Sequence, residues 1–167
     1  MSGFRPELIL AALERRQVRY AVIGGLAAVI QGAPTVTFDV DIAPETSADN
    51  MDHLSQALRD LDARAHTADT PEGVRFDHTG ESLSEVSVWN LTTTHGNLDI
   101  SLKPAGTEGY DDLVDRLVRI KVMSVDVPVA SLEDVIRSKE AANRGKDRAT
   151  LPLLRRTLEE IRRQECR

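Results

Sequence analysis

The sequence lacks the cysteines on which small disulfide-stabilised domains depend. Its one cysteine, Cys166, is next to the last residue, so no disulfide can form within the chain. This fits a reducing compartment, and we expect a cytoplasmic protein. A chain of 167 residues can bury roughly 70% of its extended surface, so a single domain over residues 1–167 is expected to need no cross-links.

Long apolar runs are also missing. No uninterrupted run approaches the roughly 20 apolar residues that a membrane-spanning helix needs. Near the N-terminus, Glu7, Glu14 and Arg15 interrupt any apolar core of a signal peptide. We therefore expect no membrane association.

Basic charge, aromatic residues and paired histidines are scarce. The net charge is −6, so a polyanion would have to bind a local basic patch. Trp89 and Phe76 are expected to pack in the core or at an edge strand rather than to stack on bases. The histidines lack the spacing of zinc ligands. They are His53, His66, His78 and His95.

Hydrophobic periodicity predicts an α+β fold. Helices are expected at residues 6–16, 26–31, 48–60, 110–116, 131–143 and 151–163. Strands are expected at residues 20–23, 37–42, 85–91, 98–102, 118–122 and 125–129. The weakly patterned segment 62–82 is expected to be a loop with an edge strand near residues 74–76. This order predicts a mixed β-sheet with helices on one side and a C-terminal helical part at about 131–167.

The most informative stretch is residues 21–42, where a short buried strand runs into Gly24 and Gly25. A helix follows at once, so several free backbone N–H groups meet at one point. The helix dipole adds partial positive charge there, which favours an anion. Glycine also lets a phosphate approach the backbone without a Cβ in the way.

The next predicted strand carries Asp39 and Asp41, which lie two residues apart and therefore share one face. Phe38, Val40 and Ile42 are expected to face the core. Two carboxylates held so close repel each other and lose hydration unless a cation lies between them. Hard oxygen ligands suit Mg²⁺.

A third acid, Asp99, lies on the alternating strand 98–102. With the glycine pair and Asp39 and Asp41 it describes a metal-assisted site for phosphoryl groups. Two Mg²⁺ ions, with Mn²⁺ as the alternative, would clamp an in-line displacement. Asp39 and Asp41 would bridge both ions, and Asp99 would complete the ion that activates an acceptor hydroxyl and help to take its proton.

The glycine pair followed by Asp39-Val40-Asp41 resembles the signature of the polymerase-beta-like nucleotidyltransferase superfamily. The run Gly96-Asn97-Leu98-Asp99-Ile100 is similar to the third-carboxylate strand of that superfamily. Residues 105–110, 129–139 and 143–147 follow in matching order. Together, over about residues 18–155, they resemble the small bacterial branch that includes abortive-infection (AbiEii-type) nucleotidyltransferase toxins.

The resemblance implies transfer of a nucleotidyl group from an NTP to an acceptor hydroxyl, with Mg²⁺ and release of pyrophosphate. Lys139 would match a triphosphate-binding lysine on a helix, although neighbouring charges also fit a solvated helix face. Lys146 and Asp147 match a motif to which we assign no firm role. The nucleotide-binding residues implied are Gly24, Gly25, Thr37, Lys139 and Lys146.

Two positions depart from the superfamily pattern. Thr35 stands where relatives often carry an arginine, which leaves one phosphate or acceptor contact without its usual residue. Gly25 replaces the serine of some relatives, so only backbone N–H groups can serve the phosphates there.

Four functions remain open at this point. The first is transfer to an RNA, such as tRNA, or to a protein hydroxyl, as the toxin of a toxin–antitoxin pair with a cognate partner. The second is nucleotidylation of an antibiotic hydroxyl. The third is a non-catalytic module that binds a partner, against which the intact acids argue. The fourth is a manganese glycosyltransferase, against which the glycine pair and the absence of a longer nucleotide-sugar domain argue.

Overall fold

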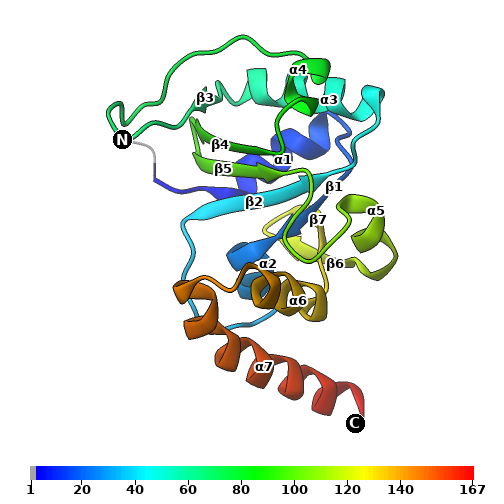
Figure 1. Ribbon diagram of the computed structural model, residues 1–167. Coiled ribbons are helices and arrows are strands. Elements are labelled where there is room, and N and C mark those ends of the chain that lie inside the picture. The colour runs from blue at the N-terminus through cyan, green and yellow to red at the C-terminus, as the bar shows by residue number, and fades with distance from the viewer. Residues whose placement is uncertain (1–2) are drawn as a thin grey trace.

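The computed structural model describes residues 3–167, which form a seven-stranded sheet in the order β3-β4-β5-β2-β1-β7-β6 (Figure 1). The strands are β1 (Tyr20–Ile23), β2 (Asp39–Pro44), β3 (Arg64–Ala65), β4 (Val88–Thr93), β5 (Gly96–Ser101), β6 (Val118–Val122) and β7 (Val125–Val129). The helices are α1 (Pro6–Arg15), α2 (Gly24–Ile30), α3 (Ala48–Asp60), α4 (Gly80–Ser84), α5 (Tyr110–Leu113), α6 (Leu132–Ala142), α7 (Gly145–Glu165) and the 3₁₀ helix η1 (Val114–Arg116).

The sheet is mixed, as predicted. The neighbours β1 and β7 are parallel, as are β2 and β5, whereas the other adjacent pairs are antiparallel. The central strands β1 and β2 therefore each have one parallel and one antiparallel neighbour. This arrangement brings the last residue of β1 close to the first residues of β2 and β5, although β5 follows β2 by more than fifty residues in the chain.

The two faces of the sheet are covered differently. On one face, Val22 and Ile42 pack in the main core with apolar residues of α1 and α3. On the other, Ala21 and Ala43 form a small cluster with Leu113 of α5. The prediction of helices on one side was therefore too narrow, because α5 packs on part of the opposite face.

Two predicted strand starts lie too early. β2 begins at Asp39 rather than at residue 37, because its pairing with β5 begins at Asp39. Phe38 therefore precedes the paired part of the strand, and its side chain is 71% exposed. The prediction that Phe38 faces the core is wrong. In the same way β4 begins at Val88 rather than at residue 85, and Val86 is exposed.

The segment 62–82 contains more structure than its weak pattern indicated. β3 pairs with β4. α4 begins at the end of the segment, and Thr79 and Ser82 form a reciprocal cap at the N-terminus of this helix. The edge strand expected near residues 74–76 is reduced to one bridge between Val74 and Ala65.

The last helix starts earlier than its apolar pattern predicted. α7 begins at Gly145 rather than at residue 151, so Pro152 lies inside the helix and not in its first turn. The helix begins at Gly145 because Asp147 accepts a hydrogen bond from the backbone N–H of Arg144 and so caps the helix. In Figure 1, α6 and α7 lie together below the sheet. Among residues 3–167 no helix combines the length and apolar character that crossing a membrane requires.

Candidate active site

The three predicted acids lie on two neighbouring parallel strands. Asp41 of β2 is in register with Asp99 of β5, and Asp39 is in register with Asn97. Residues in register on adjacent strands share a face, and so do residues two apart on one strand. Asp39, Asp41 and Asp99 therefore point to the same side of the sheet. On this side Asn90 of β4 is in register with Asp99.

Burial raises the pKa of two of these acids, Asp41 and Asp99. Burial raises the pKa of Asp41 to about 7, and the charge of Asp99, a hydrogen bond with Asp99 and the charge of Asp39 add to the effect. Lys139 opposes it. Burial also raises the pKa of Asp99, although its hydrogen bond with Asp41 works in the other direction. Without a cation, a proton is thus held between two of the acids near neutral pH.

The glycine pair fits closely against Asp41. Gly24 has a φ of +65°, and a Cβ at this position would overlap with the Asp41 carboxylate. A Cβ on Gly25 would come within 3.2 Å of Thr37 Oγ1. The absence of side chains at both positions therefore lets the turn from β1 into α2 lie directly beside the acids.

Three cationic side chains face the acids from α6 and the start of α7. Lys139, Arg144 and Lys146 line both pockets described below. The charge of Lys139 lowers the pKa of Asp41, and the charge of Asp41 helps to raise the pKa of Arg144, for which the hydrogen bond with Asp147 is the main cause. Positive and negative groups thus line the same two pockets.

Asp147 contacts two of these cations, Lys139 and Arg144. Its side chain is 0% exposed and accepts hydrogen bonds from Arg144 Nε at 2.7 Å and from Lys139 Nζ at 3.5 Å. Burial pushes the pKa of Asp147 up, but the hydrogen bonds and charge of Arg144 outweigh this, so the net shift is downward. Asp147 is therefore a buried carboxylate that holds two cations in position.

The site is hollowed into two pockets that meet at the acids. A smaller one of about 240 Å³ lies beside Gly24, Gly25 and Thr37. A larger one of about 440 Å³ lies beside Asp99 and Asn90. The residues that line both pockets are Gly24, Asp39, Asp41, Lys139, Arg144 and Lys146.

Every site residue predicted from the sequence lines one of these pockets or both. The structure adds Arg144, Asn90 and Ser138. Arg144 belongs to the run 143–147 that matched the superfamily, but no role was predicted for it. Asn90 could have been found only from the register of β4 with β5.

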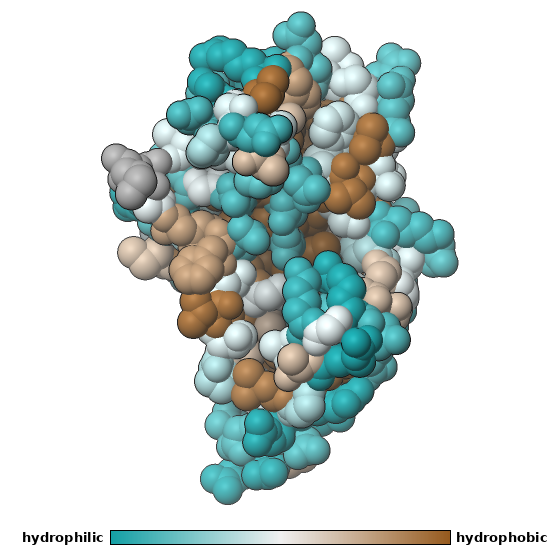
Figure 2. Space-filling model, turned by 60° about the vertical axis from the view of Figure 1, so that its left-hand side comes forward, coloured by the Kyte–Doolittle hydropathy of each residue, from teal (hydrophilic) through white to brown (hydrophobic). Residues whose placement is uncertain are grey.

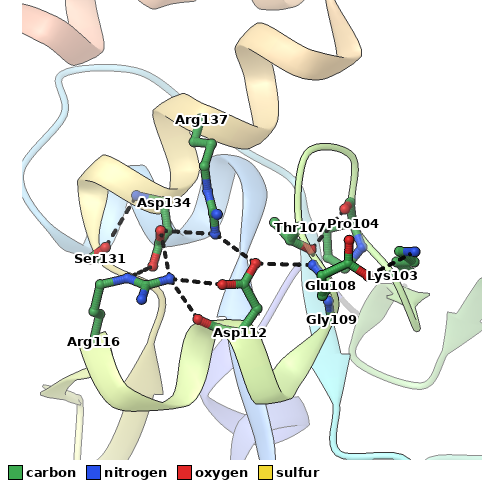
Figure 3. Close-up of polar contacts among 10 residues, drawn as sticks. All are labelled: Lys103, Pro104, Thr107, Glu108, Gly109, Asp112, Arg116, Ser131, Asp134 and Arg137. Atoms are coloured by element: carbon green, nitrogen blue, oxygen red, sulfur yellow. Dashed lines mark hydrogen bonds and ion pairs between the residues drawn. The ribbon is translucent and has the colours of Figure 1, made fainter.

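A second polar network fixes α6 against the segment before it (Figure 3). Arg116 of η1 donates through Nε to Asp134 of α6 at 2.9 Å. Arg137 donates to Asp112 at 3.1 Å and pairs with Asp134 at 3.1 Å. Its two members on α6, Asp134 and Arg137, precede Lys139 on the same helix, so the network sets the position of the helix that carries this lysine into the site.

The carboxyl groups have the donor chemistry of a divalent metal site, with oxygen ligands alone. Within residues 3–167 no three His, Cys, Asp or Glu side chains are already arranged around one point for an ion. Asp41 and Asp99 instead share the hydrogen bond described above. An ion bound here would replace that proton and offset the cost of burying the Asp41 carboxylate, which is the main cause of the raised pKa of Asp41.

A sequence comparison identifies the family of the chain. A sequence model of a family described as aminoglycoside-2''-adenylyltransferase matches residues 7–151. The chain belongs to this family. Like the family, it is a nucleotidyltransferase. No curated protein matches the sequence. The superfamily resemblance is thereby confirmed, but the comparisons do not support the abortive-infection branch.

Solved structures show the same fold. The lincosamide adenylyltransferase LnuA, bound to lincomycin, is 17% identical with a TM-score of 0.60, covering 93% of this chain and 98% of its own. ANT(2'')-Ia, in complex with adenylyl-2''-tobramycin, is 16% identical with a TM-score of 0.58, covering 92% and 87%. A Thermotoga maritima protein assigned as a nucleotidyltransferase is 21% identical with a TM-score of 0.57, covering 95% and 97%.

Proposed function

We propose that the protein transfers a nucleoside monophosphate from an NTP to a hydroxyl group of a small-molecule acceptor and releases pyrophosphate. The observation that carries the proposal is the register of Asp41 with Asp99, which puts three acids opposite Lys139 and Arg144. Family membership and the antibiotic-modifying neighbours support a small acceptor, the second of the four functions open from the sequence. A toxin acting on RNA or protein stays a prediction without an observation of its own.

The cationic side of the site would bind the triphosphate. Lys139 and Arg144 are held by Asp147 and would neutralise the β- and γ-phosphates as pyrophosphate leaves. Lys146 would add charge at the rim. The backbone at Gly24 and Gly25 and the hydroxyl of Thr37 would contact phosphate oxygens in the smaller pocket. These contacts would place the α-phosphorus over the acids.

The acidic side would prepare the acceptor. Asp99 would accept the proton of the acceptor hydroxyl as its oxygen forms a bond with the α-phosphorus, and the bond from that phosphorus to the bridging oxygen of pyrophosphate breaks. Asp39 and Asp41, with Asp99, would hold divalent ions, which we propose to be two Mg²⁺ ions with Mn²⁺ as a substitute. A bound ion supplies charge neutralisation at the phosphate oxygens and makes the acceptor hydroxyl more acidic.

The test is transfer of label from α-³²P-labelled NTPs in the presence of Mg²⁺. The four NTPs are offered separately with tobramycin, lincomycin or total tRNA, and pyrophosphate release is followed in parallel. We expect labelled product with wild-type protein and none with Asp39→Asn. Absence of both label transfer and pyrophosphate release, with every NTP and acceptor including an extract of bacterial small molecules, would contradict the proposal.

A further inference from the structure

We propose that the acceptor is an uncharged, partly apolar hydroxyl compound, and neither a polyamine sugar nor a nucleic acid. This rests on the proposed function, since it concerns the acceptor of that reaction. The inference is based on one wall of the larger pocket, made of the residues that line this pocket and not the smaller one. Because Asp99 is the group that would take the proton of the acceptor hydroxyl, the acceptor has to lie against this wall.

The wall is almost without charge. Of the described residues that line the larger pocket and not the smaller one, Asp99 alone is charged. Asn90, Ser101 and Ser138 are polar and uncharged. The apolar members include Val88, Pro104, Ala105, Val135 and Ala142.

This composition disfavours a polycation. Each ammonium group of a polyamine sugar that leaves water requires a carboxylate or several hydrogen bonds, because an unpaired buried charge is costly. The acids present, Asp39, Asp41 and Asp99, are those that would hold the metal ions. The wall offers no further carboxylate for a second or third ammonium group.

A polyanion is disfavoured for the opposite reason. A nucleic-acid acceptor has a phosphate on each side of its reacting nucleotide, and these phosphates require nearby cations. Lys139, Arg144 and Lys146 lie in the part shared with the smaller pocket, where the triphosphate would engage them. An uncharged acceptor instead gains from the apolar wall, and Asn90 and Ser138 can bond its hydroxyl groups.

The wall is also fixed before an acceptor arrives (Figure 3). Thr107 donates through Oγ1 to the carbonyl of Pro104 at 2.8 Å, and the backbone N–H of Glu108 donates to Asp112 at 3.0 Å. Gly106 has a φ of +72°, and a Cβ there would come within 2.7 Å of the Ala141 Cβ. The turn that carries Pro104 is thus packed against α6, and its shape selects among acceptors at little ordering cost.

An apolar side chain at the rim extends this character to the surface. Val88 is 50% exposed where it lines the larger pocket. Apolar groups interrupt the hydrophilic surface on the face shown in Figure 2. An acceptor with an apolar portion would cover such groups on binding.

The first experiment sorts acceptor activity by charge. A small-molecule extract of bacteria is separated on cation and anion exchangers, and each fraction is incubated with wild-type protein, Mg²⁺ and α-³²P-labelled NTPs, with tobramycin and total tRNA as defined probes. We expect label transfer in the fraction that neither exchanger retains and that a reversed-phase column binds. Transfer confined to tobramycin, tRNA or a retained fraction would overturn this inference while leaving the proposed function intact. No transfer with any acceptor would overturn both.

The second experiment compares Val88→Asp with Val86→Asp. Both side chains are about half exposed, so both variants should fold, but only Val88 lines the pocket. We expect Val88→Asp to raise the acceptor KM about tenfold without changing the KM for NTP, and Val86→Asp to change neither. A rise in the KM for NTP alone would show that this wall holds the nucleotide and would overturn the inference.

Discussion

The buried carboxylate of Asp147 forms an ion pair with the largely exposed Arg144, three residues before it: Asp147 Oδ2 accepts from Arg144 Nε at 2.7 Å and also from the Arg144 backbone N–H at 3.1 Å. The same carboxyl pairs with Lys139. One buried acid thus caps α7 and places two cations in the site. This explains why a charged residue is tolerated at a position with no exposure to water.

The first prediction concerns this pair. Asp147→Asn keeps the shape but removes the charge, so Arg144 and Lys139 lose their fixed positions. We expect the KM for NTP to rise about tenfold, with a loss of about 1–3 kcal/mol in the free energy of unfolding. Steady-state kinetics and urea denaturation measure the two effects.

The matched control is Asp126→Asn, which breaks an exposed pair with Arg119. It should leave both quantities unchanged, because surface pairs contribute little. If Asp147→Asn lowered stability but left the KM for NTP unchanged, the role of Asp147 would be structural only.

The second prediction concerns protons and metal. Since the pKa of Asp41 is raised to about 7, most molecules carry this proton at pH 6 in the absence of metal. Binding of Mg²⁺ should therefore release about one proton at pH 6 and much less at pH 8, and the affinity should rise with pH up to neutrality. Titration calorimetry in two buffers of different ionisation enthalpy measures this release. Equal heats in both buffers at pH 6 would count against a metal site at Asp41.

The third prediction concerns stability. The pKa of Asp41 in the folded protein lies above its ordinary value of 3.8, so the stabilisation from protonating Asp41 is complete below about pH 4 and is lost as the pH rises to about 7. Metal-free Asp41→Asn avoids this loss. Its Tm should therefore exceed that of wild type increasingly from pH 5 to pH 7, and the difference should then stay constant.

Thermal unfolding in the presence of EDTA measures the difference in Tm between Asp41→Asn and wild type at each pH. His78 contributes an opposite slope in both, because burial lowers its pKa and stability falls as the pH drops below about 6.5. A Tm difference independent of pH would mean that Asp41 is ionised throughout.

Much of this architecture could be predicted from the sequence, because local patterns specify it. Alternation gave the two strands at residues 118–122 and 125–129 at the bounds observed. The glycine pair and the acids at residues 39, 41 and 99 are read directly from residue types and spacing. The resemblance implied that the three acids share a site, but the parallel pairing of β2 with β5 that brings them to one face is given only by the structure.

The rest depended on tertiary contacts that no local pattern contains. The exposure of Phe38 follows from where β5 begins to pair with β2. The early start of α7 follows from the buried Asp147, whose partners Arg144 and Lys139 come from two helices. Asn90 joins the site only through the register of β4.

The fourth prediction concerns the turn at Gly24. Gly24→Ala would force a Cβ against the Asp41 carboxylate, in addition to the strain of a positive φ. Gly32→Ala shares the positive φ of +102° but has open space around it. Both should lose about 1–3 kcal/mol of stability. Only Gly24→Ala should lose most of its nucleotidyl transfer, measured as initial rate of label transfer. Equal activity in the two variants would contradict the close fit of the turn to the acids.

We expect the three acids to act as one unit in catalysis. The direct measurement is the single-turnover rate of nucleotidyl transfer for wild type, Asp41→Asn, Asp99→Asn and the double variant, with Asp126→Asn as control. We predict that each single variant loses at least about 10³-fold, that the double variant loses no more than a single one, and that the control is unaffected. An Asp99→Asn variant that keeps half or more of the wild-type rate would contradict the account.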